Sequence, residues 1–153
     1  MSKYDIICTS SSPKVNMAQR LDIKALNAGF TCIKIGVLSQ EVIDLLNLNR
    51  SKCDIILWED RFKYIEKHKK DFKSEQEFYE HISQIPEIIK NPDYIAKHPT
   101  SSSIEYIKRI NELMLVAIRI KDKGNLALRS AYPLSENQLN DYLTKGTALK
   151  MGK

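Results

Sequence analysis

The sequence predicts an α+β fold in which helices pack on one face of an antiparallel β-sheet. Two apolar runs on either side of Lys123-Gly124 predict a β-hairpin over residues 113–132, because glycine accepts the positive φ that tight hairpin loops need. Alternation of apolar and polar residues over 104–110 predicts a strand that pairs with this hairpin. Helical periodicity between residues 60 and 90 supplies the layer that so apolar a hairpin needs as cover.

The first third of the chain alternates between strand and helix patterns. We expect a strand over 4–9, a helix over 15–28, a strand over 30–36 and a short helix that begins after Ser39, which is a suitable N-cap. The polar connection NLNRSKC follows and is the predicted boundary. We therefore expect three parts: an N-terminal strand and helix segment without an assigned role (1–50), an α+β domain (51–146) and a mobile tail (147–153).

Within the predicted domain, the apolar run DIILW indicates a short buried strand at 54–58. A helix over 60–72 follows, and Pro86 is expected to divide the next helical pattern into two helices, at 75–84 and 86–90. Residues 94–103 are expected to form a polar loop. After the hairpin, Ser135 and Gln138 form a capping-box pattern that begins the last helix, and Gly146 ends it.

Composition limits the classes of function. The chain has 153 residues, of which 42% are hydrophobic and 28% are charged, as in ordinary globular domains. No apolar run approaches the roughly 20 residues that cross a bilayer, so we expect a cytoplasmic protein without a membrane partner. The three cysteines and three histidines have no metal-ligand spacing, and no phosphate-binding or dinucleotide motif occurs. We expect neither a metal nor a cofactor.

The net charge of +5 permits an anionic partner such as nucleic acid without demonstrating one. Positive charge is concentrated over residues 61–73, where Arg61, Lys67 and Lys69 are candidate contacts to a nucleic-acid backbone. The alternative is that this segment is an ordinary solvated helix face.

Cleavage of RNA through its own 2′-hydroxyl needs a base, an acid and cations that hold the phosphate. His68 lies at the margin of the apolar stripe of the predicted helix, where an imidazole reaches a cleft and exchanges protons near neutral pH. Arg119 and Arg129 suit the phosphate, because a guanidinium matches two of its oxygens. Ser130 and Tyr132 suit substrate positioning. Each of these residues also has an ordinary structural interpretation, such as a surface histidine or a charge on an edge strand.

The hairpin loop decides which of these side chains share a face. A two-residue loop pairs Arg119 with Leu128 and places it with Ser130 and Tyr132, whereas a three-residue loop shifts the register by one and places it with Arg129. The sequence does not choose between them. All four side chains serve one site only if the strand twists or bulges.

Several segments together resemble the phage-associated nuclease group of the barnase–EndoU–colicin–RelE-like superfamily. They are IGVLSQEVIDLLNL, IILWEDRFKYIEKHKKDF, IPEIIKNPDYIAKHP, SSIEYIKRI, LVAIRI and LRSAYPLSE, which span about residues 35–140. The resemblance implies a curved antiparallel sheet and RNA cleavage that needs no metal. It also implies that His68 is the acid or base and that the hairpin residues line the sheet. Tyr64 stands where the family often has a second histidine.

We therefore expect a small endoribonuclease, encoded by a phage as a toxin or effector, that acts on RNA and is met by a protein inhibitor or phage partner protein. The alternative is a non-catalytic phage accessory module of the same fold that binds RNA or protein. Tyr64, in place of a histidine, favours this alternative.

Overall fold

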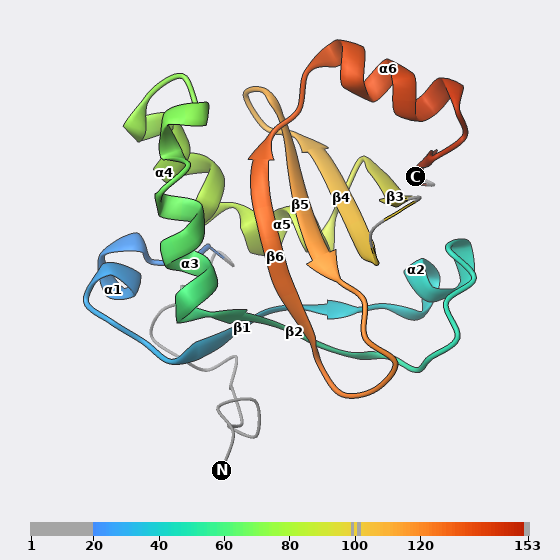
Figure 1. The fold of residues 1–153 in the computed structure, drawn as a ribbon, viewed down its shortest axis with the longest axis horizontal. Coiled ribbons are helices and arrows are strands. Elements are labelled where there is room, and N and C mark those ends of the chain that lie inside the picture. Colours follow the sequence, from blue (N-terminus) through green and yellow to red (C-terminus); the bar gives the residue numbers. More distant parts are fainter. Residues whose placement is uncertain (1–19, 99, 101, 152–153) are drawn as a thin grey trace.

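The computed structural model describes residues 20–98, 100 and 102–151. It confirms the predicted α+β class: one curved, mostly antiparallel sheet with helices packed on it (Figure 1). The strands are β1 (Cys32–Leu38), β2 (Cys53–Trp58), β3 (Tyr94–Lys97), β4 (Ser103–Arg109), β5 (Leu113–Arg119), β6 (Leu126–Pro133) and β7 (Ala148–Lys150). The helices are α1 (Ile23–Asn27), α2 (Gln40–Leu45), α3 (Glu59–Glu66), α4 (Glu75–Ser83), α5 (Ile85–Lys90) and α6 (Glu136–Thr144), with a 3₁₀ turn, η2, at Lys69–Asp71.

The strand order across the sheet is β1-β2-β6-β5-β4-β3-β7, and every neighbouring pair is antiparallel except β2 and β6, which are parallel. The central three strands, β4 to β6, come from the predicted strand and hairpin. In Figure 1, β1 and β2 cross the lower part of β6, α3 stands beside β6, and α6 lies above β4 and β3. This arrangement covers one face of the central strands with the main core and leaves the polar side chains described below on the other.

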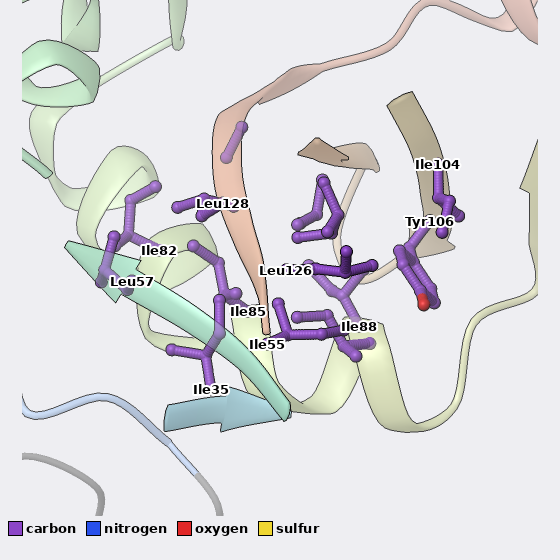
Figure 2. Packing of buried hydrophobic residues seen from close by; sticks show 14 of the residues in the cluster. Ile35, Ile55, Leu57, Ile82, Ile85, Ile88, Ile104, Tyr106, Leu126 and Leu128 are labelled. Atoms are coloured by element: carbon purple, nitrogen blue, oxygen red, sulfur yellow. The ribbon is translucent and has the colours of Figure 1, made fainter. Parts of the chain in front are cut away.

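The main core lies between the sheet and the two helices α4 and α5. Figure 2 shows Ile55 of β2 and Leu126 of β6 directed toward Ile85 and Ile88, which lie in α5. Pro86 is at the start of α5, which confirms that it divides the helical pattern in two, because proline is tolerated only in the first turn of a helix.

Gly36 allows α5 to approach β1 closely. A β-carbon at this position would lie 2.7 Å from Cγ2 and 3.3 Å from Cβ of Ile89, and this Cβ is held in place by the backbone of α5. Gly36→Ala is therefore expected to lower the free energy of unfolding by about 1–3 kcal/mol through overpacking. Urea denaturation measures this, and Ile89→Ala is the control, because it should cost less in the Gly36→Ala background than alone. Equal costs in both backgrounds would show that the two residues do not compete for space.

The hairpin between β5 and β6 contains both of the predicted registers. Near the loop, Arg119 pairs with Ala127, as expected of a three-residue loop with Gly124 at positive φ (76°). Beyond a β-bulge, Ala117 pairs with Ser130, which is the register of the two-residue loop. The extra residue is Arg129. The extra residue shifts the alternation of side chains along β6 by one position. Ser130 therefore lies on the same face as Ala127, and both lie on the face of Arg119.

The structure also differs from the sequence prediction at two strands. Residues 94–97 form β3 instead of part of a polar loop, and residues 148–150 form β7 instead of belonging to a mobile tail. β7 is the edge strand and β3 lies between it and β4, and pairings of only three or four residues do not stand out in a periodicity pattern. The sheet therefore extends past both limits of the predicted 51–146 domain, since β1 precedes residue 51 and β7 follows residue 146.

The strand expected over 4–9 and the first part of the helix expected over 15–28 lie outside the described residues. Their described remainder is α1, which begins after the N-cap Asp22. No helix of the described part of the chain is long and apolar enough to cross a membrane.

Candidate active site

Two rows of side chains cross β4, β5 and β6 on the face opposite the main core. Pairing across the strands aligns Ser103 with Arg119 and Ala127, and aligns Glu105 with Ala117 and Ser130. The alternate residues of β4 and β5, such as Ile104 and Ile118, point to the core instead. Because Ala117 contributes only a methyl group, little separates Glu105 from the β6 side chains on the far side of its row.

Arg129 joins these rows because of the bulge. Its Nη1 donates a hydrogen bond to Oγ of Ser103 at 3.0 Å, and so crosses from β6 to β4 over the Arg119 row. Its backbone carbonyl accepts a hydrogen bond from Nη1 of Arg61 in α3, at 3.3 Å. One bulged residue thus connects the sheet face to α3.

Glu105 is the buried acid of the site. Only 2% of its surface is exposed, and Oε2 accepts a long hydrogen bond of 3.4 Å from the hydroxyl of Tyr132. Burial raises the pKa of this carboxyl, while a hydrogen bond from Tyr142 of α6, the charge of His98 and the bond from Tyr132 partly oppose the rise. Its second oxygen, Oε1, is buried without a hydrogen-bond partner among the described residues. Oε1 therefore keeps an unused acceptor position, at a place that solvent does not reach.

The hydroxyl groups of Tyr132 and Tyr142, beside this carboxyl, stay protonated. Burial, and next the negative charge of Glu105, raise the pKa of Tyr132 well above its usual range and raise that of Tyr142 to about 12. Both hydroxyls are therefore donors at neutral pH. Tyr142 also packs with Tyr132 on the smaller apolar cluster that Leu139 joins, so α6 closes this end of the face.

His98 lies at the end of β3, where its backbone N–H donates to the carbonyl of Ser103 at 3.0 Å. Nδ1 accepts from the backbone N–H of Thr100 at 3.2 Å, which places the proton of the neutral ring on Nε2. The charge of His98 acts on Glu105. A histidine, a buried carboxyl and two arginines therefore share one face.

The predicted site residues fall into two groups. Arg119, Arg129, Ser130 and Tyr132 come together on the sheet face, as the bulge condition required. His68 lies apart from them, after the end of α3, where its ring contacts Tyr64 at 4.9 Å between ring centroids and Nδ1 lies 3.8 Å from the Asp71 carboxylate. The interactions of His68 are thus with its own segment.

The three predicted nucleic-acid contacts are divided in the same way. Arg61 reaches the sheet through the Arg129 carbonyl, and it lines a cavity of about 100 Å³ together with Arg119 and Lys121. Lys69 pairs with Glu75 at 3.1 Å, and Lys67 is exposed to solvent.

Sequence reasoning missed Glu105, His98, Ser103 and Tyr142. One signal was present: Glu105 stands in the middle of a strand between two buried positions, where an unpaired carboxylate is costly and often functional. His98 had no comparable signal, because a histidine before Pro99 fits an exposed loop equally well.

Arginines beside a buried acid and a histidine, on a curved antiparallel sheet, are an arrangement suited to binding a phosphate ester. Comparison with protein families agrees: the family model described as phage-Barnase-EndoU-ColicinE5/D-RelE like nuclease 3 matches residues 33–141. The chain belongs to this nuclease family, which implies a nucleic-acid substrate. No curated protein and no solved structure matches the chain significantly.

Proposed function

We propose that the protein is an endoribonuclease that cuts RNA through the 2′-hydroxyl without a metal ion, as a phage-encoded toxin or effector acting in the cytoplasm. The observation that carries the proposal is the bulge at Arg129. It places two guanidinium groups, Arg119 and Arg129, on the same face as a buried acid, Glu105. Phosphate binding and proton transfer then occur at adjacent positions.

The two arginines hold the phosphate. A phosphodiester that bonds to Arg129 and Arg119 gains negative charge as the attacking oxygen adds, and fixed cations stabilise that charge most strongly in the transition state. Ser130, at the end of the Glu105 row, donates a hydrogen bond to a substrate oxygen, and the hydroxyl of Tyr132 positions the ribose.

The proton transfers are assigned to Glu105 and His98. Oε1 of Glu105 removes the proton from the 2′-hydroxyl as the oxygen forms a bond to phosphorus. The bond from phosphorus to the 5′-oxygen breaks, and that oxygen takes a proton from Nε2 of protonated His98. The products are a 2′,3′-cyclic phosphate and a 5′-hydroxyl. A carboxyl whose pKa is raised by burial is suited to the role of base near neutral pH.

The assignment of His68 as the acid or base stays a prediction. The geometry favours His98 for this role, because its charge acts on Glu105, while the contacts of His68 are with Tyr64 and Asp71.

Purified protein incubated with total RNA in excess EDTA tests the function. Cleavage to fragments with cyclic-phosphate ends is expected. Cleavage only after a divalent metal is added would overturn the metal-independent step, and intact RNA in every condition would overturn the enzymatic proposal.

Arg129→Ala is expected to lower the cleavage rate by about 10²- to 10³-fold, as measured for single stabilising donors in other enzymes. Arg109→Ala is the matched control, because it removes the same charge from a different place. Arg109 is an exposed arginine on β4 that pairs with Glu136. Single-turnover cleavage of one defined RNA measures both. Equal losses would show that net charge, and not the position of Arg129, sets the rate.

The second candidate is a non-catalytic module of the same fold that binds RNA or protein. The near-complete burial of Glu105 favours it, because an enzyme must admit substrate to that carboxyl. Retention of RNA without cleavage in the assay above would support this candidate.

A further inference from the structure

Three side chains form a continuous stack along α3 and the turn after it. The Cζ atom of Arg61 lies 4.9 Å from the centre of the Tyr64 ring, and the Tyr64 and His68 ring centres are 4.9 Å apart. Arg61 and Tyr64, spaced i and i+3, lie on one side of α3, and the His68 ring continues the stack from the turn after the helix. We call Arg61, Tyr64 and His68 the α3 ladder.

The α3 ladder is exposed although it is ordered by its own contacts. Tyr64 has 43% of its surface exposed, and the side chain of His68 has 49% exposed. Much of the Tyr64 and His68 rings is therefore accessible to a ligand. The Arg61 contact to the Arg129 carbonyl and the Asp71 contact to His68 fix the two ends of the stack.

The foot of the ladder meets the candidate active site. Arg61 lines the cavity of about 100 Å³ that Arg119 and Lys121 also line, with Trp58 at its wall and one carboxylate, Asp60. Its volume is well below the roughly 300 Å³ at which pockets for whole small molecules begin, so it suits a phosphate group better than a nucleotide. A chain of phosphates that leaves Arg119 therefore passes Arg61 before it reaches Tyr64.

We propose that the α3 ladder is a stacking surface for the unpaired bases of a single-stranded RNA, and that the cavity at its foot holds the phosphate next to the scissile one. This inference rests on the proposed function and makes its substrate a single strand of several nucleotides. Aromatic rings interleaved with cations suit this ligand, because every base has a face that stacks and every nucleotide carries one phosphate. A duplex hides its bases from such a surface.

The test measures binding, so that it does not depend on cleavage. Oligonucleotides with 2′-O-methyl groups, which cannot be cut through the 2′-oxygen, are titrated by fluorescence anisotropy as a dinucleotide and as an octanucleotide. Tyr64→Leu is expected to weaken octanucleotide binding by roughly fivefold to hundredfold, the usual loss of one stacked base. Tyr64→Phe, which keeps the ring, should bind as wild type does. The dinucleotide carries a single phosphate, which fills the scissile position and leaves the cavity at the foot of the ladder empty, so it should bind all three proteins equally.

Each result decides one of the two proposals. Octanucleotide binding that is unchanged in Tyr64→Leu, equal loss for both lengths, or equal binding of a duplex of the same length would overturn the ladder. So would a wild-type protein that binds no octanucleotide. Length-dependent binding that Tyr64→Leu removes, in a protein that does not cut unmodified RNA, would keep the ladder and overturn the endoribonuclease.

Discussion

Replacing His98 with alanine is expected to lower the rate of RNA cleavage by about 10²- to 10⁴-fold, the usual contribution of a general acid or base. The reason is position: His98 presents a proton on Nε2 beside the face that carries Glu105, Arg119 and Arg129. Replacing His68 should instead change mainly the affinity for long substrates, because its ring belongs to the α3 ladder. Single-turnover rates at saturating RNA separate the two effects.

The two alanine variants act as controls for each other. Both remove an imidazole that is at least partly exposed, so neither is expected to prevent folding, and far-UV circular dichroism checks this. A His98→Ala protein that cuts at the wild-type rate would reject His98 as the acid. If His68→Ala lost the larger part of the rate at saturating RNA, the assignment first suggested by the sequence would be restored.

Much of the fold follows from local pattern. Helices α3 to α6 and strands β4 to β6 have strong periodicity or clear caps, such as the capping box of Ser135 and Gln138 that the structure confirms. The short strands β3 and β7 do not, because three or four residues carry too little pattern and the pairing of β3 with β7 joins segments distant in sequence.

The site could be predicted only in part, and the hairpin explains why. The loop chemistry at Lys123-Gly124 was compatible with two registers, and the structure uses both, one on each side of the bulge. A bulge is the cooperative result of several strands packing together, so no local motif announces Arg129 as its extra residue. The sequence did predict that Arg119 and Arg129 share a site with Ser130 only if the strand twists or bulges, and the structure has a bulge.

The helix expected to include His68 was predicted too long, while the role of His68 itself stays a prediction. Its place on the margin of an apolar stripe predicted a cleft, but α3 ends at Glu66 and His68 lies in the turn before η2. The prediction continued the helical periodicity to residue 72, although the helix ends at Glu66. The side chain then continues the stack of Arg61 and Tyr64 instead of turning to the sheet.

Glu105→Gln is expected to have opposite effects on activity and on stability. It removes the proposed base, so cleavage should fall by about 10²- to 10⁴-fold and the rise of rate with pH that the raised pKa of Glu105 causes should disappear. The same change removes a buried charge. The melting temperature of Glu105→Gln at pH 7 should therefore lie above that of wild type, as is common when a strained functional group is replaced.

The pH dependence of this difference gives the sharper test. Burial raises the folded-state pKa of Glu105 above its unfolded value, so the folded protein binds more protons between these two pKa values and loses stability as pH rises through that range. The advantage of the glutamine variant should be absent below about pH 4, where Glu105 is protonated in both the folded and the unfolded state, and complete above the folded pKa.

Glu80→Gln is the control with the opposite sign, because the hydrogen bond from Gln84 lowers the pKa of Glu80 and that variant should be slightly less stable at pH 7. Thermal melts from pH 4 to pH 8 measure both. A Glu105→Gln protein that melts below wild type at pH 7 would show that the carboxylate stabilises the fold, and that its burial does not serve catalysis.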